Sequence, residues 1–178
     1  MRTLPAAAVG AAVLTLATVT PSAQAADTTV TFTVQGQNLA VSAPASAALS
    51  NTSFGGTATG QLGTVTVNDQ RGGVPVPWTA TVTSTALTTG AGGANQSIPN
   101  SDVEYWSGPA TSTNGSGTFT PGQTTAAAAV MLSSAQTAFA HTGGGGANSA
   151  SWNPTLIVNV PTTVAAGQYS GTITHSVA

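Results

Sequence analysis

The segment 102–106, with the sequence Asp-Val-Glu-Tyr-Trp, carries the side chains best suited to ligand chemistry. Alternate residues of a strand point to opposite faces, so Asp102, Glu104 and Trp106 would share one face if this segment is a strand. An indole beside two carboxylates is typical of a sugar-binding surface, because the ring stacks on a pyranose and the carboxylates accept hydrogen bonds from hydroxyls. The alternative is an acidic sheet edge with a partly covered Trp.

The same two carboxylates also permit a hydrolase hypothesis. Residues i and i+2 of a strand lie ~6.5–7 Å apart along the backbone, which overlaps the ~6.5–9.5 Å separation of inverting glycosidases. Every such pair on any strand has this spacing, so the sequence disfavours catalysis at Asp102 and Glu104. There is no Gly-x-Ser-x-Gly elbow and no Cys. Because Lys is also absent, phosphate-binding loops and Schiff-base cofactors are excluded. We expect no enzyme and no cofactor.

The two histidines do not predict a metal site. His141 and His175 are isolated from each other and from any zinc-ligand spacing. His141 precedes the glycines 143–146, so we expect it in a flexible loop. His175 shares an apolar face with Ile173 and Val177, which favours a hydrogen-bonded core or edge residue over a ligand.

The chain has almost no charge. The whole sequence holds two cations, Arg2 and Arg71, and four acidic residues. Nucleic-acid binding depends on clusters of Lys and Arg that neutralise phosphates, and a chain with so few cations cannot supply them. The same scarcity argues against electrostatic adhesion to anionic polymers or lipid headgroups. Any ligand would have to be held by hydrogen bonds and aromatic contact.

The N-terminal residues read as a secretory signal peptide. Arg2 provides a short positive region, residues 6–19 are apolar, and Ala23-Gln24-Ala25 resembles a cleavage site. The apolar run is shorter than the ~17–25 residues of a spanning helix. We therefore expect residues 1–25 to be removed, and residues 26–178 to form one secreted, extracellular domain without a membrane span.

Apolar residues alternate with Thr through most of this domain. The pattern covers 30–34, 64–67, 78–83, 156–160 and 169–177, and it is typical of strands with one buried and one wet face. Breaks rich in Gly, Asn and Ser fall at 51–60, 88–100, 108–117 and 141–148. We predict an all-β fold, a single antiparallel β-sandwich of immunoglobulin-like or Greek-key-like type. Residues 126–132 are predicted as a strand or a single helical turn.

Two more aromatic residues and one ion pair have structural interpretations. Trp78 and Trp152 lie in phase with the apolar side of their strands, which predicts core packing. Asp69 and Arg71 stand two residues apart before a Gly-Gly turn. A local ion pair that fixes this turn is the interpretation that we favour.

Two segments together resemble the signature of a known family. Residues 67–73 contain Asp69, Arg71 and Gly72 and lead into Trp78, and the C-terminal run contains Tyr169, Ile173, His175 and Val177. These segments resemble the WxL surface domain of Gram-positive bacteria, in which Asp-x-Arg-Gly leads into Trp-x-Leu and a closing strand runs from Tyr to a second Trp. Ala80 stands where the family has Leu, and His175 stands where it has the second Trp.

The resemblance implies a non-catalytic, all-β module held non-covalently on the cell wall. The implied partner is peptidoglycan or another wall glycan, and possibly a second surface protein. For Trp78, a wall-binding role would require exposure and conflicts with core packing. A self-assembling secreted structural protein is the alternative, because Thr-rich strands without Lys leave sheet edges unguarded. A secreted hydrolase is the third and least favoured hypothesis.

Overall fold

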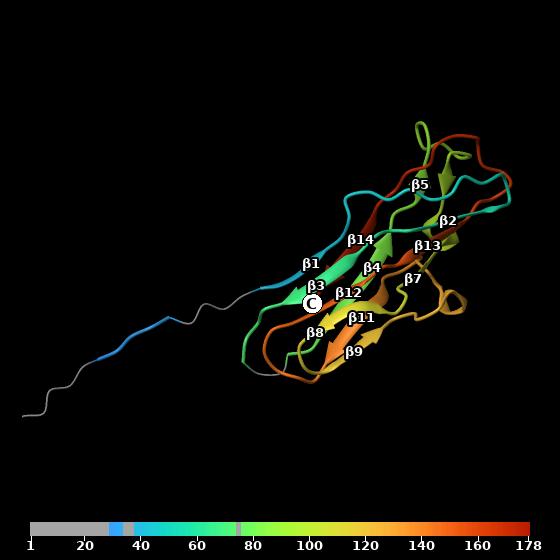
Figure 1. The fold of residues 1–178 in the computed structure, drawn as a ribbon. Coiled ribbons are helices and arrows are strands. Elements are labelled where there is room, and N and C mark those ends of the chain that lie inside the picture. The colour runs from blue at the N-terminus through green and yellow to red at the C-terminus, as the bar shows by residue number, and fades with distance from the viewer. Residues whose placement is uncertain (1–28, 34–37, 74–75) are drawn as a thin grey trace, which may run out of the picture. The chain divides into compact units, whose positions relative to one another are not determined.

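Antiparallel strands make up nearly all of the regular structure (Figure 1). The computed structural model describes residues 29–33, 38–73 and 76–178. Residues 35–178 form one compact unit, which is described here by itself. This architecture confirms the predicted all-β sandwich. The predicted signal peptide, residues 1–25, lies outside the described residues.

Three four-stranded sheets build this unit, and we call them sheets A, B and C. Sheet A has the order β1 (Leu39–Ser42), β3 (Val65–Asp69), β12 (Asn148–Trp152), β8 (Ala110–Asn114). Sheet B has the order β10 (Val130–Met131), β7 (Val103–Trp106), β13 (Thr155–Asn159), β2 (Thr57–Gln61). Sheet C has the order β14 (Ile173–Val177), β4 (Trp78–Ser84), β11 (Gln136–Thr142), β9 (Thr118–Pro121). A short hairpin, β5 (Leu87–Thr88) with β6 (Ser97–Ile98), and two 3₁₀ turns, η1 (Asn100–Asp102) and η2 (Ala126–Ala128), complete the described elements.

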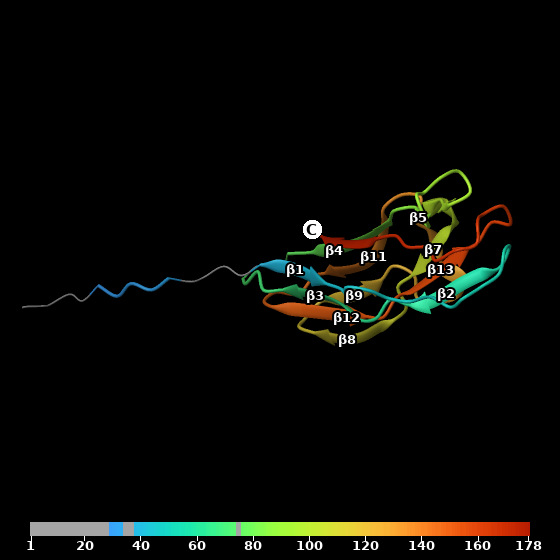
Figure 2. The same ribbon diagram turned by 90° about the horizontal axis from the view of Figure 1, so that it is seen from above.

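Sheets A and C form the two layers of the sandwich. Figure 2 shows β4 and β11 in one layer and β3 and β12 in the other. Between the layers, Phe139 of β11 stacks on Trp78 of β4 with ring centroids 6.2 Å apart, and on Trp152 of β12 at 4.9 Å. All three rings are almost wholly buried. The predicted core packing of Trp78 and Trp152 is confirmed.

Sheet B continues from sheet A through a bend. Strands β2 and β3 are joined by residues 62–64, while their partners β13 and β12 are joined by 153–154. Leu62 N–H donates to Pro154 O across this joint at 2.8 Å. Gly63 adopts a positive φ of 86°, which a glycine accepts without strain. Sheet B therefore leaves the plane of sheet A and lies beyond its end (Figures 1 and 2).

The period-two pattern located several strands correctly. In β4 buried positions alternate with exposed or half-buried Thr residues along all seven positions. The segments predicted at 64–67 and 156–160 correspond to β3 and β13 within the usual uncertainty of strand ends. Residues 126–132 contain both alternatives that the sequence left open, since η2 is followed by β10.

Other expectations were wrong. Residues 30–33 form no strand, and Val30 and Phe32 are about four-fifths exposed. Alternation alone cannot make a strand without a partner, and within 29–33, 38–73 and 76–178 no residue pairs with them. Val34 lies outside the described residues. The breaks predicted at 51–60 and 108–117 contain β2 and β8, whose Thr, Ser and Gly residues pair with central strands despite their turn-like composition.

The last strand is shorter than predicted. Only Ile173–Val177 forms β14, whereas residues 169–172 are irregular apart from a single bridge between Ser170 and Thr88. Gly171 runs close to the β5 strand, where an added Cβ would approach Leu87 Cδ2 to 2.6 Å. The chain here is bound to the hairpin rather than to sheet C, so Tyr169 does not share a strand face with His175.

Candidate functional site

Ligand-binding candidates from the sequence gather on the outer face of sheet B. Glu104 and Trp106 occupy the half-buried positions of β7, alternating with buried residues that point to the core. Trp106 lies opposite Thr155 on β13, and Asn159 lies opposite Thr57 on β2. We call this surface the polar face; it consists of Thr57, Asp102, Glu104, Trp106, Thr155 and Asn159.

Asp102 reaches this surface by a different route from the one predicted. It is not a strand residue but the last residue of the 3₁₀ turn η1, where its N–H donates to Pro99 O at 3.0 Å. Pro, Asn, Ser and Asp in succession favour such a turn over a strand. Asp102 nevertheless borders a shallow hollow of about 310 Å³ together with Asn159 and Thr57.

Hydrogen bonding links the carboxylate of β7 to this hollow. Asn159 Nδ2 donates to Glu104 Oε1 at 2.9 Å. The bond joins neighbouring strands and fixes the amide between Glu104 and the hollow that Asp102 borders. Asp102, Asn159 and Thr57 therefore line one small depression, and Glu104 is bonded to the Asn159 amide beside it. Carboxylates, amides and hydroxyls are the group types that bind sugar hydroxyls.

The side chain of Trp106 is less exposed than that of a residue on a fully solvated strand face. The side chain is half-buried, and its Nε1 is inaccessible to solvent with no partner among the described residues. The polar edge of the indole is therefore turned inward. What remains for a ligand is the carbon surface of the ring, which suits stacking rather than hydrogen bonding.

The first signature segment forms a buried network. Arg71 makes two parallel bonds to the buried Asp69, from Nε to Oδ1 at 2.9 Å and from Nη2 to Oδ2 at 3.0 Å. Arg71 Nη2 also donates to Pro77 O at 3.2 Å. The predicted ion pair between Asp69 and Arg71 is confirmed. The hydrogen bonds from Arg71 hold the pKa of Asp69 below its usual value.

This network extends to the buried indole of the same signature. Trp78 Nε1 donates to Asn148 Oδ1 at 2.8 Å, and Asn148 Nδ2 donates to Asp69 Oδ2 at 3.3 Å. Sequence reasoning missed Asn148, because its partners lie 70 and 79 residues away and no local pattern marks it. Gly72 is exposed and an added Cβ would meet nothing within 4 Å.

The closing strand contributes a second buried network. Trp152 Nε1 donates to Tyr105 Oη at 3.0 Å, and Tyr105 Oη lies 3.2 Å from His175 Nε2. Tyr105 Oη accepts from Trp152, and the direction of the bond between Tyr105 and His175 depends on the tautomer of the imidazole. Burial lowers the pKa of His175 to about 4, so the ring is neutral at neutral pH. The predicted hydrogen-bonded core or edge role of His175 is confirmed.

The other signature positions near the C-terminus are structural. Ile173 and Val177 are half-buried on the same side of β14 as His175 and pack against the core. Tyr169 donates from its hydroxyl to Ala165 O at 2.8 Å. His141, predicted in a loop, lies buried in β11 opposite Trp78 and Phe119, because β11 continues through it as the central strand between β4 and β9.

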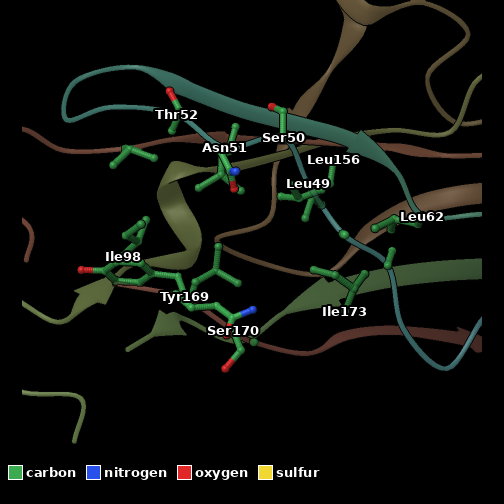
Figure 3. Close-up of a pocket in the computed structure, with 18 of the residues that line it drawn as sticks. Leu49, Ser50, Asn51, Thr52, Leu62, Ile98, Leu156, Tyr169, Ser170 and Ile173 are labelled. Atoms are coloured by element: carbon green, nitrogen blue, oxygen red, sulfur yellow. The ribbon is translucent and has the colours of Figure 1, made fainter. Parts of the chain in front are cut away.

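A cavity of about 950 Å³ lies where sheet B diverges from β14 (Figure 3). Buried Ile98, Leu156 and Val158 form part of its lining, and half-buried Leu49 and Ile173 project toward it from opposite sides. Composition gave no signal for this cavity, because it depends on the bend between sheets A and B. It is separate from the polar face.

Within the described ranges of the chain, no group of three or more His, Cys, Asp or Glu is arranged to hold a metal ion. No helix in those ranges is long and apolar enough to cross a membrane. Comparison of the chain with protein-family models, with curated proteins and with solved structures found no match. Its function must therefore be inferred from its own geometry.

Proposed function

We propose that this chain is a secreted, non-catalytic cell-surface module whose polar face binds neutral glycan of the cell wall. The observation that carries the proposal is that Asp102 and Asn159 line one hollow, with Glu104 bonded to Asn159 and the indole of Trp106 further along the same strand face as Glu104. Glycan recognition needs fixed acceptors and donors for hydroxyls and an aromatic carbon surface for the sugar ring. The polar face supplies each of these.

Charge supports the same kind of ligand. The polar face carries two carboxylates and no cation, which disfavours phosphate-rich or carboxylate-rich polymers. Hydroxyl groups of a neutral polysaccharide can donate to Asp102 and Glu104 without that penalty. One oxygen of Glu104 is already bonded to Asn159, which suits a fixed hydrogen-bond acceptor. This is the basis for proposing binding rather than hydrolysis.

The resemblance to the WxL surface domain adds wall association to the proposal. In this chain the buried network that joins Asp69, Arg71 and Trp78 accounts for the first signature segment without any ligand. The signature would then stabilise the fold, and the polar face would make the contact with the wall. This division removes the conflict between a buried Trp78 and a wall-binding role.

Secretion is tested separately from binding. Cleavage after Ala25 should give a culture-supernatant protein that begins at Ala26, as measured by intact mass. An exported protein that retains Met1 or Arg2 would contradict the proposed cleavage.

Wall binding is tested by sedimentation with purified cell-wall sacculi and by titration with soluble neutral polysaccharides. Trp106→Ala should weaken binding about 5–30-fold, the equivalent of about 1–2 kcal/mol for one stacked ring. Glu104→Gln should weaken it less, and both variants must first be shown to be folded. Phe54→Ala is the matched control, because Phe54 is an exposed aromatic residue outside the polar face. Equal binding by all of these proteins would overturn the proposal.

Self-assembly is a second candidate, and the sheet edges favour it. Apart from β2, which the segment 43–54 covers, the described edge strands are β1, β8, β9, β10 and β14, and they contain no charged side chain. Charged residues are the usual guard against edge-to-edge pairing, so these edges are open to a second copy. Sedimentation velocity over a wide concentration range would show concentration-dependent oligomers without glycan. A Thr113→Lys change on the exposed side of β8 should then dissociate them if β8 forms the contact.

A further inference from the structure

We propose that the cavity between sheet B and β14 binds an uncharged amphiphile, a molecule with a hydrocarbon chain and a hydroxyl head. Its volume of about 950 Å³ lies at the upper end of the ~300–1,000 Å³ typical of small-molecule sites. Apolar side chains from the core line its interior. This site does not depend on the proposed glycan binding, and its test is separable from that one.

The segment 43–54 forms one wall of the cavity. It lies close against β2 because glycines in and next to that strand leave room for it. Ser50 N–H donates to Thr59 O at 2.9 Å, and Thr59 N–H donates to Ser50 Oγ at 3.0 Å. A Cβ at Gly60 would come within 2.9 Å of Ala48 O, and one at Gly63 within 2.8 Å of Pro44 Cγ. The segment is therefore fixed along β2 and does not fill the space beside it.

The segment 164–173 forms the opposite wall and is fixed as firmly. Ser170 and Thr88 exchange two backbone hydrogen bonds of 2.8 and 2.9 Å. The hydroxyl of Tyr169 holds the backbone at Ala165, as described above. Both walls are thus anchored independently of any ligand, so the cavity is largely preformed. A preformed site loses less ordering entropy on binding.

Charge decides the class of ligand. No Asp, Glu, Lys or Arg occurs among the described residues that line the cavity. A carboxylate or phosphate placed there would lose hydration without gaining a countercharge, whereas a hydroxyl loses much less. The polar lining groups are hydroxyls and amides, including Ser50, Asn51, Thr52 and Ser170 (Figure 3). These can bond a hydroxyl head while the chain occupies the apolar interior.

His175 adds one directed polar group. It lines the cavity, and in the neutral tautomer whose Nε2 accepts from Tyr105 the ring proton resides on Nδ1. Among the described residues no acceptor bonds to Nδ1. A neutral imidazole N–H of this kind can donate to a ligand hydroxyl without introducing charge.

The test uses N-phenyl-1-naphthylamine, an uncharged fluorescent probe, displaced by two ligands of equal chain length. We expect saturable probe binding, and displacement by 1-tetradecanol at least tenfold more effective than by myristate at pH 8. Both competitors are used below their aggregation limits. Absence of saturable binding, or equal displacement by alcohol and carboxylate, would overturn the proposal.

A charge placed in the cavity should reverse this preference. Ile173→Lys puts a cation on the lining and should improve displacement by myristate at least tenfold relative to 1-tetradecanol. Val177→Lys is the matched control, since Val177 is half-buried on the same side of β14 but does not line the cavity. If Ile173→Lys and Val177→Lys, both folded, improved displacement by myristate equally, the probe would bind elsewhere and the proposal would be overturned. Trp106→Ala should leave displacement unchanged whether or not it affects glycan binding.

Discussion

Replacement of His175 should remove a defined part of the protein's pH-dependent stability. The folded-state pKa of His175 is lowered to about 4 by burial, while the unfolded value is near 6.5. Between these values the unfolded chain takes up a proton that the folded protein does not. The unfolded state is therefore favoured as the pH falls, and the free energy of unfolding decreases from pH 6.5 towards pH 4.

The size of this effect follows from the two pKa values. Linkage gives a loss of about 2 kcal/mol at pH 5 and about 3 kcal/mol at pH 4, relative to pH 7.5. Such a loss is a large share of the ~5–15 kcal/mol that stabilises a typical domain. Asp69, whose pKa is also lowered, adds its own loss only at more acidic pH, below its normal value of 3.8.

Urea unfolding at pH 7.5, 6.5, 5.5 and 4.5 measures the effect. His175→Gln removes the titration but keeps an acceptor for the Tyr105 hydroxyl. Its unfolding free energy should therefore depend less on pH than that of the natural protein. Tyr105→Phe is the control, because it removes the hydrogen bond and keeps the buried imidazole. Tyr105→Phe should lower the unfolding free energy at every pH and leave its dependence on pH unchanged. The same dependence of unfolding free energy on pH in the natural protein and in His175→Gln would refute the argument.

Three further predictions concern the buried networks and one tight glycine. Trp78→Ala should cost about 3–5 kcal/mol of unfolding free energy by chemical denaturation, because it leaves a core cavity; Trp78→Phe should cost less, about 1–3 kcal/mol, since it strands the Asn148 acceptor. Arg71→Lys should lower the thermal midpoint although charge is kept, because one ammonium cannot reproduce the two parallel bonds to Asp69; an unchanged midpoint would contradict this. Gly122→Ala should cost about 1–3 kcal/mol, since its Cβ would overlap Thr137 O; full stability would show that β9 shifts freely.

Sequence patterns located the strands whose two faces differ most. Strand β4 was predictable because Trp78, Ala80 and Val82 alternate with Thr along one continuous run. Strands β2 and β8 were not predictable. Each has one neighbouring strand and mostly small polar residues, so its sequence does not alternate between apolar and polar residues as β4 does. Pairing with β13 and β12 makes them strands, and that information lies far away in the sequence.

The candidate sites show the same limit. Glu104 and Trp106 were correctly placed on one face, because strand alternation is local. The 3₁₀ turn at Asp102 was missed, although Pro99 before it favours a turn. The partners Asn148 and Asn159 act over more than fifty residues, and nothing near them in the chain identifies them.

The first buried network explains why Asp69 and Trp78, two positions of the resemblance to a surface-domain signature, do not contact a ligand directly. Asn148 joins the end of β3 at Asp69 to the start of β4 at Trp78, and His175 with Tyr105 joins β14 to β7 across the divergence of sheets B and C. A signature made of such residues preserves a scaffold. Binding then depends on surfaces that the scaffold orients, and these are the polar face and the cavity. The polar-face and cavity variants proposed above should therefore alter binding with small changes in stability, whereas Trp78→Ala and Arg71→Lys should lower stability and leave binding by the folded protein unchanged.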